Sequence, residues 1–402
     1  MNKNIESLYN IARKPVRKII GLMSGTSLDG LDIALCEISG SGENTNVKVT
    51  HFETSDYSED IKKEIRTVFA KKNIDFRHLA LLNEWIGLLH AQKINEALHK
   101  WDLKSSEIDI IASHGQTVMH IPKTQHKIDK FPNATLQIGD GDHIAVKTGI
   151  ITISDFRQKH LAAGGEGAPL AVYGDYFLFG KKGENRIMLN LGGIANFTYL
   201  PSTMNSEDVF VTDTGTGNTL IDAFTRLHFP EMSYDKDAAI AKKGQVNQDL
   251  LSQLKSDIFF KTAFPKTTGP ELFNIEYVQK AIVQSNNEDI SISDLLATLT
   301  RFSAETIIEA IEYPIKNSGL NICEFTVYVS GGGMHNPLLI QYLNELLPCK
   351  FKRTDELGIL GDAKEAVLFA VLANETLSGG EAEFGKREGV PSISMGKISF
   401  PN

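Results

Sequence analysis

An apolar strand, a tight turn and a second apolar strand occupy residues 19–36, and this hairpin limits the possible folds more than any other stretch. Its tip contains Gly25, Thr26 and Ser27. Bare backbone N–H groups and hydroxyls gathered in this way form a nest that suits phosphate oxygens. The tip is not a Walker A loop, because no Gly-Lys-Ser/Thr follows and the next element is a strand. An ordinary hairpin with a Gly-rich turn fits this stretch equally well.

The pattern of a strand followed by glycines returns twice. Residues 186–197 again predict an apolar strand, a glycine turn and an apolar continuation, and residues 325–336 end a strand in three glycines. Between them, the Gly-rich run 213–218 opens a helix predicted over residues 219–227. Such a turn offers a positive helix end and free N–H groups, which favour an anion. Together these turns favour a two-lobed kinase in which each lobe supplies one phosphate-binding hairpin.

Size and composition agree with this interpretation. A chain of 402 residues suits two domains, and its net charge of -9 argues against a nucleic-acid partner. The three cysteines are widely spaced and contain no Cys-x-x-Cys, so neither a disulfide framework nor a zinc site is expected. The first 15 residues lack the apolar core of a signal peptide, and no long apolar run follows. We therefore expect a cytoplasmic protein without a membrane partner.

Polar residues that follow a predicted strand are the next candidates. Residues 108–113 predict a short buried strand that ends in the polar run 114–117, and α/β proteins place ligands just past such strand ends. A structural role for His114 is an equal alternative. Residues 136–142 and 149–154 predict a hairpin or a pair of strands.

A charged run and a glycine run lie next to each other further along the chain. Residues 155–160 lead into the Gly-rich loop 163–169, which indicates close approach of the backbone to a polar ligand. Towards the C-terminus, residues 362–365 resemble a capping box for a helix over residues 366–377. The two carboxylates of that run are then accounted for by backbone donors alone.

Taken together, these stretches resemble the anhydro-N-acetylmuramic acid kinase family, which has the actin–hexokinase–Hsp70 superfold. The resemblance covers nearly all of residues 17–402. It rests on the runs 21–30, 113–117, 136–140, 155–157, 164–170, 189–196, 213–218, 266–269 and 330–337. It implies an α/β fold of two ribonuclease H-like lobes with ATP in the interlobe cleft. The lobes are expected at residues 1–183 and 184–361, with a C-terminal helix and tail (362–402) returning to the first lobe.

The resemblance also implies an activity and a set of site residues. The enzymes of this family use ATP and Mg²⁺, add water across the anhydro bridge of 1,6-anhydro-N-acetylmuramic acid and phosphorylate O6. They release N-acetylmuramic acid 6-phosphate during cell-wall recycling, commonly as homodimers. The residues implied to bind ATP are Gly25, Thr26, Ser27, Leu28, Asp29, Gly30, Leu31 and Asp32, then Gly192 and Gly193, with Gly331, Gly332 and Gly333 near the nucleoside. The residues implied on the sugar side are His114, Thr117 and Asp155, and none is assigned to the metal.

The sequence departs from the family pattern where the family activates water. His160 stands at the position of the family's catalytic Asp, three residues after Asp-Phe-Arg. Glu166 replaces the usual Gln of the Gly-rich loop, and Pro270 stands where an Arg is expected. A neutral His can accept a proton but cannot stabilise positive charge at C1 as a carboxylate does. We therefore expect either His160 as the base or Glu166 as a substitute carboxylate, with Asp155 as a further alternative.

Three functions remain in competition. The first is the active anhydro-sugar kinase, which the intact phosphate turns favour. The second is a divergent relative that binds nucleotide or amino sugar as a binding or regulatory protein, which the changed base position favours. The third is an actin-like ATPase with a protein partner, for which the sequence contains no additional partner-binding insertion.

Overall fold

The computed structural model describes residues 1–25, 27–168, 170–379 and 391–402, so Thr26 of the predicted phosphate turn lies outside the described residues. The chain divides into two compact units. The first unit consists of Met1–Gly180, Asn205–Glu207 and Gly358–Asn402, and the second of Lys181–Met204 and Asp208–Leu357. Within the described ranges, no helix has both the length and the apolar character needed to cross a membrane.

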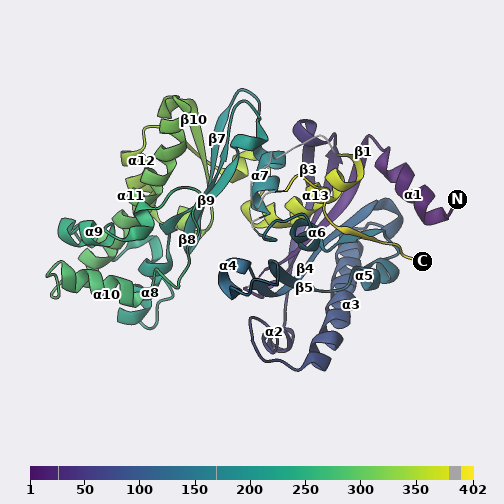
Figure 1. Cartoon of the computed structure of the whole chain (residues 1–402), viewed down its shortest axis with the longest axis horizontal. Helices are drawn as coiled ribbons and strands as arrows, with labels where there is room; N and C mark the ends of the chain where they lie inside the picture. Colours follow the sequence, from purple (N-terminus) through teal and green to yellow (C-terminus); the bar gives the residue numbers. More distant parts are fainter. Residues whose placement is uncertain (26, 169, 380–390) are drawn as a thin grey trace. The chain divides into compact units, whose positions relative to one another are not determined.

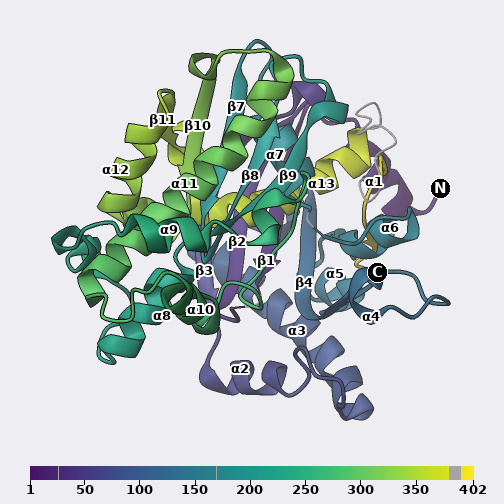
Figure 2. The ribbon, with the colours of Figure 1, turned by 60° about the vertical axis from the view of Figure 1, so that its left-hand side comes forward.

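The sheet of the first unit is built on the predicted hairpin. Its strands are β1 (Val16–Ser24), β2 (Gly30–Ser39), β3 (Asn46–Asp56), β4 (Ile110–Ile121), β5 (Ala134–Ile138), β6 (Thr152–Ser154) and β12 (Lys397–Ser399). β1 and β2 are antiparallel, with Met23 opposite Asp32, and β3 continues antiparallel beside β2. On the other side of β1, β4 runs parallel to it (Figures 1 and 2). β6 then runs parallel to β4. This order, β3-β2-β1-β4-β6, is that of a ribonuclease H-like domain.

Helices cover both faces of this sheet. They are α1 (Lys3–Ala12), α2 (Glu59–Arg66), α3 (Phe76–Lys100), α4 (Lys123–His126), α5 (Gly141–Thr148), α6 (Phe156–Ala162), α7 (Ala171–Phe179) and α13 (Lys364–Ser378). The apolar side of α3, including Leu82, Ile86 and Ile94, packs into one core with the sheet. α13 lies directly against β1, where a Cβ at Gly21 would be 1.9 Å from the carbonyl oxygen of Ala366. Gly21 therefore permits the close packing of α13 on the hairpin.

The second unit repeats the strand order of the first. Its strands are β7 (Asn185–Leu191), β8 (Ile194–Leu200), β9 (Phe210–Thr216), β10 (Phe325–Ser330) and β11 (Lys350–Arg353). β7, β8 and β9 are antiparallel neighbours, and β10 and β11 run parallel to β7 on its other side. The order β9-β8-β7-β10-β11 matches that of the first unit. The predicted fold class, α/β with two ribonuclease H-like lobes, is thus confirmed.

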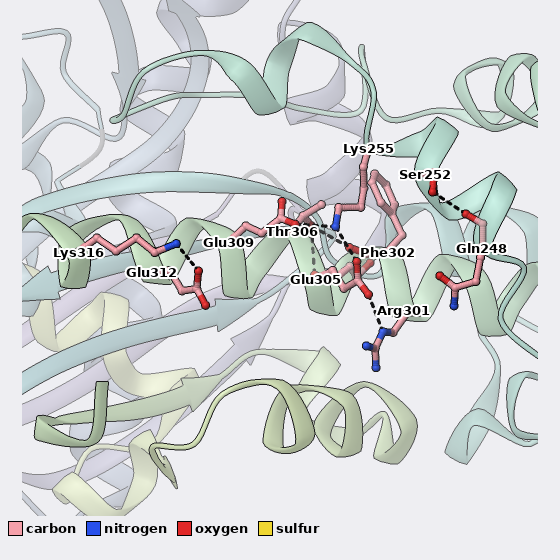
Figure 3. Close-up of polar contacts among 11 residues, drawn as sticks. Gln248, Ser252, Lys255, Arg301, Phe302, Glu305, Thr306, Glu309, Glu312 and Lys316 are labelled. Atoms are coloured by element: carbon pink, nitrogen blue, oxygen red, sulfur yellow. Dashed lines mark hydrogen bonds and ion pairs between the residues drawn. The ribbon is translucent and has the colours of Figure 1, made fainter. Parts of the chain in front are cut away.

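A long helix organises the rest of the second unit. The helices are α8 (Thr219–His228), α9 (Gln248–Leu254), α10 (Ile275–Gln284), α11 (Ile292–Ser318) and α12 (Pro337–Leu346). Figure 3 shows Lys255, just after α9, reaching α11, where its Nζ lies 2.6 Å from carboxylate oxygens of both Glu305 and Glu309. Arg301 Nε lies 2.8 Å from the other oxygen of Glu305. This linked set of charges ties the end of α9 to α11.

Several elements differ from those predicted. The polar run 114–117 lies inside β4 rather than past its end, because β5 pairs with the second half of β4 and extends it. Residues 136–142 and 149–154 do not pair with each other, since α5 separates β5 from β6. The charged run 155–160, for which no element was predicted, lies mostly in the helix α6.

Candidate active site

The tip of the β1–β2 hairpin is fixed from within the protein. Leu28 and Leu31 are buried in the core, whereas Ser27 and Asp29 are exposed. Leu28 adopts a φ of 62°, and its N–H lies 3.4 Å from the Gly25 carbonyl oxygen. The two leucines therefore anchor the turn by packing and leave its polar residues at the surface.

Gly30 has a structural explanation of its own. A Cβ at this position would lie 2.6 Å from the carbonyl oxygen of Ser55 on β3. The need for glycine at the start of β2 follows from this close approach of a neighbouring strand. It does not require a ligand at Gly30.

Carboxylates gather near the hairpin. Burial raises the pKa of Asp32, and the charges of Asp362 and Asp29 raise it further, against the effect of a hydrogen bond from Thr54. Burial likewise raises the pKa of Glu365, opposed by the positive charge of Arg157. Within the described part of the chain, no group of three or more His, Cys, Asp or Glu side chains is arranged to hold a metal ion.

The capping box predicted at residues 362–365 is not formed. The N-cap of α13 is Ala363, and no side chain caps the helix. Glu365 instead lies in the first turn of α13, in the electrostatic field of Arg157 and Asp32. Its carboxylate is therefore available to the site rather than committed to the backbone of the helix.

His114 is held by Arg157, a residue not singled out from the sequence. The His114 Nδ1–H donates to the Gly115 carbonyl at 2.8 Å, and its Nε2 accepts from Arg157 Nε at 2.8 Å. The ring also packs on Phe369 of α13, with 4.8 Å between centroids. Burial and then the charge of Arg157 lower the pKa of His114 well below its usual value. His114 is therefore neutral, with both ring nitrogens engaged.

His160 is also buried, with 1% of its surface exposed. Its Nδ1 accepts the N–H of Gly167 at 3.0 Å, and its Nε2 lies 3.1 Å from the hydroxyl of Tyr173. That hydroxyl donates to the Pro391 carbonyl at 2.8 Å, so the imidazole Nε2–H donates to Tyr173. Burial and then Arg157 lower the pKa of His160 to about 4. The neutral ring thus has its lone pair directed at the Gly-rich loop.

The Gly-rich loop carries Glu166 between two anchored glycines. Arg157 NH1 donates to the Gly167 carbonyl at 2.7 Å, and Asn133 Nδ2 donates to the Gly165 carbonyl at 3.2 Å. A Cβ at Gly165 would lie 2.1 Å from the His160 ring, so this position requires glycine. Glu166 is half-buried, and among the described residues no hydrogen bond or ion pair engages its carboxylate.

Thr117 and Asp155 have different surroundings. The Thr117 Oγ1 accepts a hydrogen bond from Gln137 Nε2 at 3.1 Å and is half-buried. The Asp155 carboxylate is 2.6 Å from Lys397 Nζ of β12, and Asp155 itself has a φ of 62°. Asp155 is thus committed to an ion pair with the C-terminal strand, a pairing that no sequence motif indicated.

In the second unit, the glycine turns converge at one edge of the sheet. The Gly193 carbonyl accepts the N–H groups of Gly217 at 2.7 Å and Thr219 at 3.1 Å, and the Gly192 carbonyl accepts that of Asn218 at 3.0 Å. These three N–H groups at the start of α8 are therefore paired within the protein, and the anion site expected at this helix stays a prediction. The Gly192–Gly193 turn is locked onto α8.

The third glycine turn packs against the same strand. A Cβ at Gly331, whose φ is 85°, would lie 2.6 Å from Asn190 Oδ1, and one at Gly333 would lie 2.8 Å from the Leu191 Cβ. Gly332 has open space around its Cβ position. The outer two glycines thus permit close packing on the end of β7, and Gly332 faces no such constraint.

Asp213 on β9 binds the segment that contains Lys266. The Asp213 N–H donates to the Lys266 carbonyl at 2.9 Å, and Asp213 Oδ2 accepts the Thr268 N–H at 2.8 Å. The Lys266 Nζ lies 4.5 Å from the ring centroids of both Phe259 and Phe264. Burial raises the pKa of Asp213 to about 6, against the effect of the Thr268 hydrogen bond.

This raised pKa predicts a pH effect on stability. The folded state binds a proton at Asp213 more tightly than the unfolded state, so the free energy of unfolding falls as pH rises from about 4 to about 6. Asp213→Asn keeps an acceptor for Thr268 and removes the titration. We expect the variant to gain about 1 kcal/mol relative to wild type across this window, because partial exposure reduces the effect. Urea unfolding at several pH values measures it, and parallel curves would contradict it.

Comparisons with known proteins agree over the whole chain. The family model described as anhydro-N-acetylmuramic acid kinase matches residues 17–398. Proteins named anhydro-N-acetylmuramic acid kinase from Pseudoalteromonas atlantica and Pseudoalteromonas translucida are 54% identical over 405 residues and 52% identical over 403 residues, each covering 100% of both chains. A solved structure of the activator of the 2-hydroxyisocaproyl-CoA dehydratase from Clostridium difficile is 12% identical, with a TM-score of 0.39 over 90% of this chain and 95% of that chain. That likeness is too loose to bear on function.

Proposed function

Because the chain belongs to the anhydro-N-acetylmuramic acid kinase family, we propose that it uses ATP to convert 1,6-anhydro-N-acetylmuramic acid into N-acetylmuramic acid 6-phosphate. In this reaction a water oxygen bonds to C1 and the C1–O6 bond breaks. O6 takes the γ-phosphoryl group, and ADP leaves. A base must accept the proton that the water loses.

The observation that carries the proposal is the placement of Glu166. Its loop is held on both sides by Arg157 and Asn133. Among the described residues its own carboxylate makes no hydrogen bond or ion pair, and its charge acts on His120. A positioned, unpaired carboxylate suits a general base and stabilises positive charge that develops at C1. We therefore assign the base to Glu166.

His160 receives a different role. The Nδ1 lone pair that a base would use accepts the Gly167 N–H, and Nε2–H donates to Tyr173. The ring is also buried, away from solvent. We therefore assign His160 as a positioning residue that holds the loop of Glu166, although it stands where the family carries its catalytic Asp.

For the nucleotide, we assign the β1–β2 hairpin of the first unit to the ATP phosphates. Asp32 and Glu365 are the carboxylates that would hold Mg²⁺. Burial raises the pKa of both, nearby carboxylates raise it further, and a bound cation would lower these pKa values again. One or two of them suffice, since Mg²⁺ usually keeps phosphate and water ligands. When bound, the ion neutralises phosphate charge during phosphoryl transfer. The homodimer expected from the resemblance stays a prediction.

Product analysis tests the proposed function. The protein is incubated with ATP, Mg²⁺ and the anhydro sugar, and ADP release is followed together with the mass of the sugar product. We expect a product heavier than the sugar by one H₂O and one HPO₃, with the label of H₂¹⁸O incorporated at C1. Unchanged sugar despite ATP binding would contradict the kinase and favour a binding or regulatory protein.

A further inference from the structure

Gln116 lies on β4, the strand that carries the sugar-side candidates His114 and Thr117 and is called the sugar-side strand below, and its side chain reaches the phosphate turn. It sits on β4, opposite Ser24, the last residue of β1, in the parallel pair. Both side chains have no exposed surface. A buried carboxamide must have its donors and acceptor paired, and its partners therefore reveal what it holds.

Every polar atom of this carboxamide is used. Gln116 Oε1 accepts from the Ser24 hydroxyl at 2.6 Å. Its Nε2 donates one proton to the Gly25 carbonyl at 3.2 Å and the other to the Thr117 carbonyl at 3.1 Å. One side chain thus joins the backbone of the phosphate turn to the backbone of the sugar-side strand.

The hydrogen bond from Gln116 to the Gly25 carbonyl also affects which backbone groups the turn exposes to a ligand. The Gly25 carbonyl accepts from both Gln116 and the Leu28 N–H, so its oxygen is directed into the protein. A carbonyl oxygen directed outward would repel phosphate oxygens. Holding it inward keeps the tip suitable for an anion.

The same amide orders the sugar-side strand. Thr117 is fixed by its carbonyl through Gln116 and by its hydroxyl through Gln137. Any ligand that orders one of the two backbones lowers the entropy cost of ordering the other. From this geometry we propose that Gln116 is a positioning residue that couples ATP binding to sugar binding; this inference rests on the proposed function.

The test measures coupling rather than activity alone. The affinity for a non-hydrolysable ATP analogue is measured by calorimetry with and without the anhydro sugar, beside steady-state kinetics. The variants are Gln116→Met, which removes both donors, and Ser24→Ala, which leaves the donors but removes the anchor of the amide. The matched control is Gln92→Met on the exposed side of α3.

We expect the sugar to raise the analogue affinity of wild type and of the control about 5- to 50-fold. In Gln116→Met this factor falls towards one and kcat falls about 10- to 100-fold. Ser24→Ala gives a smaller change in the same direction and carries the test if Gln116→Met does not fold. Unchanged coupling in a folded variant, or a wild type that turns over sugar without coupling, would overturn the inference. A wild type that does not turn over the sugar overturns the proposed function and this inference with it.

Discussion

Replacing Glu166 with glutamine is expected to lower kcat about 10²- to 10⁴-fold while leaving nucleotide affinity within a few-fold of wild type. Glutamine has nearly the same shape but cannot accept a proton from water at neutral pH. The backbone anchors of the loop, from Arg157 and Asn133, do not involve the altered side chain. The loss should therefore fall on the chemical step rather than on folding.

Steady-state kinetics and binding of an ATP analogue check this expectation together. Glu231→Gln is the matched control, since it makes the same change at an exposed carboxylate of the second unit. A thermal melt like that of wild type excludes a folding defect. Near-normal turnover in Glu166→Gln would contradict the assignment, and Asp155→Asn is then the next variant to test. The Asp155→Asn variant also loses the ion pair between Asp155 and Lys397.

Local patterns predicted the frame of the molecule well. The β1–β2 hairpin and the helix predicted over residues 219–227, observed as Thr219–His228, depend on short-range patterns that the sequence displays directly. The length of β4 depends instead on pairing with β5, which follows it after the short helix α4 and a loop. Strand ends set by such non-local pairing cannot be recognised from composition.

The candidate site shows the same contrast between features set by local sequence and features set by distant contacts. His114 and Glu166 were recognisable within glycine-rich motifs, whereas Arg157 and Gln116 stood in the same motifs without being singled out. Their importance comes from partners outside their own motifs: Arg157 reaches His114, and Gln116 reaches Gly25. A basic residue in the charged run that leads into the Gly-rich loop was the available signal for Arg157. Nothing in the spacing indicated the bond from Gln116 to the hairpin.

The role of His160 was the hardest to predict, because three separate segments define it. Its ring is hydrogen-bonded to Gly167 and to Tyr173, and Tyr173 is in turn hydrogen-bonded to Pro391. From the sequence, an imidazole at the base position indicated a base. In the structure that imidazole is buried, and both of its ring nitrogens are engaged in hydrogen bonds, which is not what a base requires.

Two substitutions of His160 therefore separate a base from an anchor. Asparagine places its Oδ1 where the imidazole has Nδ1, so His160→Asn can still accept the Gly167 N–H, but it cannot act as a base. We expect this variant to keep kcat within about 10-fold of wild type. His160→Leu leaves the Gly167 N–H buried and unpaired, which should cost about 1–3 kcal/mol of stability and lower kcat about 100-fold.

Kinetics and chemical unfolding of both variants decide between the two roles, with His99→Asn on the exposed side of α3 as the control. The pKa of about 4 also predicts that wild type loses stability as pH falls from about 6.5 to 4, since the unfolded chain then binds the proton more tightly. Both variants should lack this part of the acid sensitivity. If His160→Asn folds normally yet is as inactive as His160→Leu, the imidazole itself takes part in the reaction, and Glu166 is not the sole base.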